Sequence, residues 1–371
     1  LGRDIDPTQV VHTHDSYTKF GQELRLSSPS HNAWRLTAGA FMQRQTNRHI
    51  ADYELPGVAN AVNAFSPPVP GAPQDDVYYT NANRVDRDYA VFGEAAYDLT
   101  HNVTLEAGIR GFKADNTLFG FSGGASSVAK QATIANCAVL TYAGCPNINK
   151  RYTESGETHK VQLKWQIEPS KMVYLTYSTG FRPGGNNRNA YFNGHSQDIP
   201  AFLADTLTNW ELGWKTSWGG RKLYFNGAVF QEDWNKVQYS LPGILGIYYT
   251  LNAGKARSRG VEGSINWRAA PGLTISGNAT YIDAKLTTAF VGSDGTVQAP
   301  SGTRLPVTPH VKLNATARYE AKLGAHDAFA QASLNYQDGA RTYLTTAGES
   351  VLGPTRGFTT VDLSAGVSRG P

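Results

Sequence analysis

Apolar and polar residues alternate along several segments of this chain. In residues 159–168, one set of alternate positions is apolar: Val161, Leu163, Trp165 and Ile167. The positions between them are polar: Lys160, Gln162, Lys164 and Gln166. Residues 273–282 and 311–320 repeat the pattern. Because successive side chains of a β-strand point to opposite faces, this period of two predicts strands with one apolar and one polar face.

Weaker versions of the same pattern occur from one end of the chain to the other. Further stretches start or lie near Tyr17, Trp34, Tyr89, Val103, Met172, Thr208, Leu223, Val261, Ala328 and Thr359. Together these segments predict about thirteen strands. Many have roughly nine to twelve residues, which is the length that crosses a bilayer at a tilt. The pattern therefore predicts an all-β protein whose antiparallel strands cross a membrane.

The connections between these strands alternate between two kinds. Short turns are expected at 27–33, 98–102, 168–171, 219–222, 269–272 and 321–327. Long polar loops are expected between them, at 45–86, 114–157, 181–205, 239–251, 286–307 and 338–357. Outer-membrane β-barrels have short periplasmic turns and long extracellular loops, so the alternation favours that architecture.

Composition agrees with a barrel and excludes other classes. No window approaches eighteen consecutive apolar residues, which excludes a helical membrane span, and the 19 Tyr, 7 Trp and 38 Gly suit strands and turns. Tyr and Trp lie near predicted strand ends, where aromatic girdles are expected: Tyr17, Trp34, Tyr97, Trp165, Trp218 and Trp267. The net charge of +4 is spread along the chain, so we expect no nucleic-acid partner.

Two cysteines, Cys137 and Cys145, lie in one Gly- and Ala-rich stretch. In an oxidising compartment their spacing predicts a disulfide that closes a small surface loop, the alternative being two independent thiols. The chain opens without a signal peptide, and single-chain bacterial barrels have even numbers of strands. We therefore expect residues 1–371 to be part of a larger barrel.

Several segments resemble the barrel of TonB-dependent receptors. They are Phe20–Ser28 (FGQELRLSS) with Trp34–Phe41 (WRLTAGAF), Tyr174–Gly184 (YLTYSTGFRPG), Asn209–Lys215 (NWELGWK) leading into Leu223–Phe230 (LYFNGAVF), Asn252–Gly263 (NAGKARSRGVEG) and Leu305–Pro309 (LPVTP). Their order and spacing match the family from about residue 17 to 367, nearly the whole chain. No single motif identifies the family, but the whole set in this order is fairly specific to it.

The resemblance implies a partial 22-stranded barrel in the bacterial outer membrane. The family places a plug domain inside the barrel and a short box that contacts TonB ahead of it, and neither is found in these residues. Members of the family transport scarce nutrients, most often ferric siderophores, without covalent chemistry and without a resident cofactor. The expected partners are thus TonB through the missing parts, outer-membrane lipid and a small iron chelate.

Candidate ligand residues lie in the loops that the resemblance places outside the cell. Loop 181–205 combines cations, amides and aromatic rings: Arg182, Asn186, Asn187, Arg188, Tyr191, Phe192 and His195. Tyr78, Tyr79, Trp234 and Tyr239 lie in or near other loops. Such groups suit an anionic chelate through charge-assisted hydrogen bonds and ring contacts. The alternative for each residue is an ordinary turn or solvated loop position.

Signals for other chemistry are weak. His12, His14 and Asp15 are close in sequence but lack a convincing third ligand, so we predict no metal site. No Gly-x-Ser-x-Gly, His-Glu-x-x-His or phosphate-binding glycine loop is found, and we expect no enzyme activity.

The sequence is also compatible with two alternative functions. One is a passive outer-membrane porin, which would lack any plug. The other is a soluble secreted β-propeller, which would require a repeat of about 40 to 50 residues that the chain does not contain.

Overall fold

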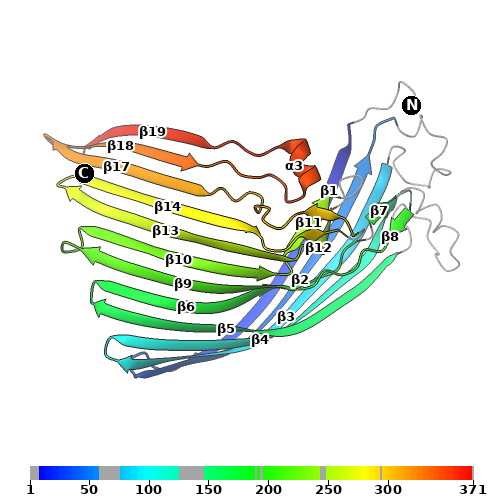
Figure 1. The fold of residues 1–371 in the computed structure, drawn as a ribbon, viewed down its shortest axis with the longest axis horizontal. Coiled ribbons are helices and arrows are strands. Elements are labelled where there is room, and N and C mark those ends of the chain that lie inside the picture. The colour runs from blue at the N-terminus through cyan, green and yellow to red at the C-terminus, as the bar shows by residue number, and fades with distance from the viewer. Residues whose placement is uncertain are drawn as a thin grey trace.

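The computed structural model describes residues 8–57, 76–124, 146–188, 190–192, 195–242, 248–292 and 295–369. Thirteen long strands form one antiparallel sheet in the order β1-β2-β3-β4-β5-β6-β9-β10-β13-β14-β17-β18-β19. The sheet is curved and open, with β1 and β19 at its two edges (Figure 1). The predicted antiparallel fold and strand number are confirmed.

The strands of the sheet are long, and most exceed the soluble average of about five to six residues. Their bounds are β1 Val10–Ser27, β2 Trp34–Glu54, β3 Asp76–Thr100, β4 Val103–Gly124, β5 Ile148–Glu168, β6 Lys171–Arg182, β9 Asp205–Trp218, β10 Leu223–Asn235, β13 Lys255–Ala270, β14 Leu273–Leu286, β17 Val311–Leu323, β18 His326–Gln337 and β19 Phe358–Arg369.

Small elements fill the long loops at the opposite end from the short turns (Figure 1). They are the hairpins β7 Ala190–Phe192 with β8 His195–Gln197, β11 Gln238–Pro242 with β12 Tyr248–Asn252, and β15 Phe290–Val291 with β16 Val297–Ala299, and the helix α3 Thr346–Leu352. No helix in the described ranges has the length and hydropathy of a membrane span.

One face of the sheet is a continuous apolar surface. Direct pairing across neighbouring strands aligns Trp34, Tyr97, Leu105, Leu163, Leu175, Leu212, Val229, Val261, Tyr281 and Val311 in a single row. Many of these side chains are about half exposed, among them Leu175, Leu212 and Val229. Large apolar side chains left uncovered over a broad band of one sheet face require an apolar solvent, and this is the lipid-facing side. We call it the outer face.

The inner face carries polar and charged groups that bond to one another. Glu106 accepts from Lys160 at 3.4 Å and also pairs with Lys164, while Tyr174 donates to Glu211 at 2.7 Å. These contacts fit a hydrated charge network along a wet interior, where each pair contributes little by itself.

The predicted boundaries of two loops were wrong. The β2–β3 ladder continues through Glu54 and Asp76, inside the predicted loop 45–86. The β4–β5 ladder likewise reaches Gly120 and Ile148, inside the predicted loop 114–157. The apolar alternation ends where the outer face leaves the lipid, but backbone pairing continues beyond that level. Apolar side chains there no longer keep to one face, since Tyr79 lies on the outer face while Ala82, Leu118 and Ile148 form a buried cluster on the inner face.

Aromatic rings gather where strands end at the short turns. Trp34 and Tyr97 stack with ring centroids 4.2 Å apart, and Trp165, Trp218 and Trp267 are all exposed to a large extent. Next to this stack, Arg35 holds Asp98 through two hydrogen bonds of 2.6 Å. Rings at strand ends are typical of a membrane interface.

Burial is concentrated among the long loops. One cluster of buried apolar side chains joins the β10–β13 connection, the β14–β17 connection and the segment before α3. Its members are Val237, Leu241, Ala253, Ala256, Leu286, Phe290, Ala299 and Leu344. Tyr239 packs against it and accepts the amide hydrogen of Leu344 at 2.9 Å. Burial raises the pKa of the Tyr239 phenol. The loops thus share a core, and we refer to these eight residues as the loop core.

Candidate functional site

The loop after β6 folds back over the inner face of the sheet. Asn186 is 2% exposed, and its backbone amide donates to Asn116 Oδ1 at 2.9 Å while its side chain donates to the Asn116 carbonyl at 3.0 Å. The amide of Gly184 donates to Glu154 Oε1 at 2.6 Å. Asn116 and Glu154 lie on β4 and β5 at inner-face positions, so residues 183–188 lie against the inner wall. We refer to residues 183–188 as the inward loop.

One guanidinium group contacts the inward loop from β3, and a second belongs to the loop. Arg84 Nη2 donates to the carbonyl of Asn186 at 2.9 Å, and Arg188 Nη1 approaches Thr80 Oγ1 at 3.5 Å. Arg84 and Thr80 are both inner-face residues of β3. The arrangement presents positive charge to the interior beside a buried amide, which suits an anionic group.

Asn187 connects the inward loop to the β11–β12 hairpin. Its side-chain nitrogen donates to the carbonyls of Thr250 and Pro200, each at 2.8 Å, and its Oδ1 accepts from the amide of Thr250 at 2.8 Å. Lys150 Nζ donates to the carbonyls of Asn187 and Ile199 at 2.9 and 3.0 Å. The 5% exposed Asn187 is therefore a structural anchor.

Arg182 is held by a buried carboxylate where β6 ends. Asp205, with a side chain only 2% exposed, accepts from Arg182 Nε at 2.9 Å and from the amide of Gln238 at 3.2 Å. The Arg182 guanidinium lies 4.7 Å from the ring centroid of Trp234, which packs on the loop core. Arg182 and Trp234 are thus brought together, as a cation–π pair in the loop scaffold.

Tyr78 and Tyr79 lie at the far end of β3, on opposite faces of the strand. The Tyr78 hydroxyl is 2.5 Å from Ser122 Oγ, and its ring meets Tyr53 edge-on at 5.6 Å. Tyr79 stacks on Phe121 with centroids 6.2 Å apart. Both tyrosines are nearly fully buried, so they pack the end of the sheet.

Other predicted residues lie in the β7–β8 hairpin and at the start of β1. Tyr191 pairs with Ser196, and Phe192 with His195, in the β7–β8 hairpin that follows the inward loop. Cys137 and Cys145 lie outside the described residues. At the start of β1, His12 is 3.7 Å from Glu54, and Asp15 accepts from His49 at 2.9 Å. In the described ranges, no group of three or more His, Cys, Asp and Glu gathers as in a metal site.

Sequence reasoning missed the residues on which the inward loop rests. Arg84, Asn116 and Glu154 lie in regions predicted to be loops and contribute from strands instead. Their contacts with the inward loop join positions far apart in the sequence, and no local pattern encodes that. The inner-face parity of the strands would have identified all three if the strand ends had been predicted correctly.

Comparison with known proteins decides the family. The chain matches the family described as TonB dependent receptor-like, beta-barrel, over residues 2–369. The chain belongs to this family. Its members are outer-membrane transport receptors, so the apolar outer face lies against the lipid of the outer membrane.

Individual relatives cover the chain to different extents. The pesticin receptor of Yersinia enterocolitica is 29% identical over 143 residues, which are 37% of this chain and 20% of that protein. The solved ferric yersiniabactin uptake receptor FyuA from Yersinia pestis has a TM-score of 0.72 at 16% identity, covering 97% of this chain and 48% of that one. The siderophore receptor PiuA from Acinetobacter baumannii has a TM-score of 0.63 at 15% identity, and the match covers 95% of this chain and 50% of the PiuA chain. The chain thus spans about half the length of these solved receptors, whose likeness shows the fold.

Proposed function

We propose that the protein carrying this chain is a TonB-coupled outer-membrane receptor that takes up a ferric siderophore. The observation that carries the proposal is the inward loop, which holds Arg188 next to Arg84 on the inner wall of the sheet. A ferric siderophore is a compact chelate that presents oxygen atoms with partial or full negative charge, and guanidinium groups bind such atoms well.

In this proposal the predicted residues divide into two roles. Asn186 and Asn187 hold the inward loop, because their side chains are buried and bonded to Asn116 and Thr250. Arg188, with Arg84, provides the cations that meet the chelate. Arg182 and Trp234 stabilise the rim, Tyr78 and Tyr79 pack the end of the sheet, and Tyr191 and His195 belong to the neighbouring hairpin.

Residues 1–371 would then supply about thirteen strands of the barrel wall, and a plug elsewhere in the same protein would receive the pull of TonB. The described sheet is open, and each strand added to its edges would pair backbone groups that hydrocarbon cannot satisfy. The chain binds and positions cargo in this scheme and performs no covalent chemistry.

The relatives support this cargo class. FyuA is a ferric yersiniabactin uptake receptor, and PiuA is a siderophore receptor. Since these proteins are under 20% identical to the chain, they support the class of chelate and leave the individual siderophore open.

Uptake of radioactive iron by cells tests the proposal. The full-length protein is expressed in a strain lacking its own receptors, and a panel of ferric siderophores is supplied with and without a functional TonB. We expect at least one siderophore to be taken up only when TonB is present. Uptake that continues without TonB would indicate a passive pore instead.

A charge-removing variant then tests the site. Replacing Arg188 by Gln should weaken siderophore binding to whole cells about tenfold, as expected when one charge-assisted hydrogen bond is lost. Arg268, exposed near a short turn, provides the matched control, and Arg268→Gln should bind as the parent does.

A further inference from the structure

The outer face of β1–β4 changes from apolar to basic over a few residues. Val91 is paired with Ala40 and Gly111, a row of small and apolar groups. Two residues farther toward the long loops Tyr89 is opposite Lys113, and two residues beyond that Arg87 is opposite Arg44. Since apolar side chains of this face contact lipid, the change marks the level of the lipid headgroups.

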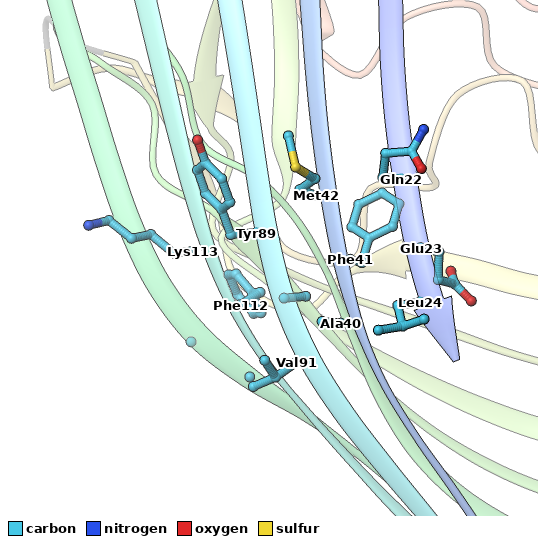
Figure 2. A pocket seen from close by; sticks show the side chains of 13 residues that line it. Gln22, Glu23, Leu24, Ala40, Phe41, Met42, Tyr89, Val91, Phe112 and Lys113 are labelled. Atoms are coloured by element: carbon cyan, nitrogen blue, oxygen red, sulfur yellow. The ribbon is translucent and has the colours of Figure 1, made fainter. Parts of the chain in front are cut away.

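A hollow opens in the outer face at this level. Its volume is about 830 Å³, and its walls include Leu24, Met42, Tyr89, Val91 and Lys113 (Figure 2). The hollow exists because small residues, Ala40 and Gly111, lie between the larger side chains. It is apolar and opens to the lipid, and a flexible hydrocarbon chain matches both properties.

The cations above the hollow have no protein counter-ion in the described part of the chain. Arg44 and Arg87 are directly opposite each other on one face, an arrangement that destabilises a sheet. The carboxylate opposite Arg87 is Asp115, which is instead bound by Arg151, with Nε at 3.3 Å. Among the described residues, neither Arg44, Arg87 nor Lys113 forms an ion pair. An anion between the two guanidinium groups would relieve their repulsion.

We propose that this region binds a membrane lipid whose phosphate headgroup carries net negative charge, with an acyl chain in the hollow and the phosphate at Arg44, Arg87 and Lys113. The charge pattern selects this occupant: a zwitterionic lipid would place less net negative charge at the cations, and a soluble anion would leave the apolar hollow empty. A protein partner would have to displace lipid from the face to reach it. The lipid would fix the height of this part of the wall in the membrane.

Lipid retention by the full-length receptor tests the proposal. The receptor is purified in an uncharged detergent, titrated with phosphatidic acid or with phosphatidylcholine of the same acyl chains, and examined by native mass spectrometry. Phosphatidic acid should be retained in preference to phosphatidylcholine. Arg44→Gln combined with Arg87→Gln should weaken its binding about tenfold or more, because two charged partners are lost.

Two further variants separate the parts of the site. Gly111→Leu places a side chain in the hollow, where a Cβ would meet only Val91 at 4.0 Å, so the strand can accept it. It should weaken retention of phosphatidic acid while the sheet remains intact by circular dichroism. Lys222→Gln combined with Arg268→Gln, two exposed cations near a short turn, should leave retention unchanged.

Three outcomes would overturn the proposal. They are equal retention of phosphatidic acid and phosphatidylcholine, unchanged retention in the doubly substituted arginine variant, and unchanged retention in Gly111→Leu. If inorganic phosphate alone bound as tightly as phosphatidic acid, the site would be one for a free anion and the acyl chain would have no part in it.

Discussion

The side-chain amide of Asn187 pairs with the backbone of Thr250 as a neighbouring strand would. Asn187 donates to the Thr250 carbonyl and accepts from the Thr250 amide, both at 2.8 Å. The pair joins the inward loop to the β11–β12 hairpin across 63 positions of sequence. One side chain thereby satisfies two backbone groups that would otherwise need water or another strand.

Replacing Asn187 by Ala should release this hairpin. The change leaves the amide and carbonyl of Thr250 unpaired and should cost about 1–3 kcal/mol of local stability. Hydrogen exchange followed by mass spectrometry should show faster exchange in residues 183–188 and 248–252. Asn278, exposed on β14, offers a control, and faster exchange in Asn278→Ala at the same two segments would show that the effect is not specific.

Replacing Asp205 by Asn should weaken the junction of β6, β9 and β11. The buried carboxylate accepts from Arg182 and from the amide of Gln238, and a neutral amide cannot replace its charge. We expect a loss of about 1–3 kcal/mol, measured by chemical unfolding of the full-length receptor in micelles. The exposed pair of Lys322 and Asp327, 2.7 Å apart, gives the comparison. Asp327→Asn should cost under about 1 kcal/mol, and an equal cost for both would refute a special role for burial.

The loop around α3 should loosen in acid. Burial alone would raise the pKa of Glu349, but the backbone amides of Tyr343 and Thr342 donate to its carboxylate and together lower the pKa below its ordinary value of 4.5. A lowered folded-state pKa means stability that is complete above 4.5 and is lost as the pH falls through the folded value.

Hydrogen exchange at pH 7 and pH 3.5, corrected for intrinsic rates, should therefore show lost protection in residues 342–353. The Glu349→Gln variant should show the loosened state at both pH values. A parent loop with equal protection at both values would contradict the assignment.

Replacing Gly213 by Ala should disturb the inner wall. The Tyr174 ring covers Gly213 so closely that a methyl group would overlap it, and the same ring donates from its hydroxyl to Glu211. Overpacking of this kind costs about 1–3 kcal/mol, so the thermal midpoint of the folded receptor should fall. At Gly93 an added Cβ would have its nearest contact, the Thr37 carbonyl, at 4.0 Å. Gly93→Ala should leave the midpoint almost unchanged, and a similar fall in both variants would remove the role of Tyr174.

Strand positions inside the membrane could be predicted because lipid and water impose opposite requirements on alternate residues. Leu163 and Lys164 are adjacent yet occupy the apolar and the charged face, and the sequence shows that difference directly. Above the membrane the signal disappears, since Asn83 is exposed on one face while Arg84 donates to the Asn186 carbonyl on the other. The strand continues there through backbone pairing that side-chain type does not reveal.

The candidate site was predictable in composition but not in geometry. Arg188 and Asn187 were expected as ligand residues because of their chemistry, yet Asn187 is buried by contacts with β12 and Pro200. The partners Arg84 and Thr250 come from distant parts of the chain, and only the folded sheet brings them together. Non-local contacts of this kind leave no periodic trace in a single sequence.

The short turns also determine how accurately the strands of the sheet find their register during assembly. Within the thirteen-stranded sheet, six ladders close across connections of six residues or fewer, for example the two residues 101–102 between β3 and β4 and 169–170 between β5 and β6. Turns this tight allow a single alignment, whereas a slip of one residue across a long loop would exchange the apolar and charged faces of every strand added afterwards. Hairpins closed by short turns are therefore the natural units of assembly. Errors in strand register are expected in the ladders that join one hairpin to the next.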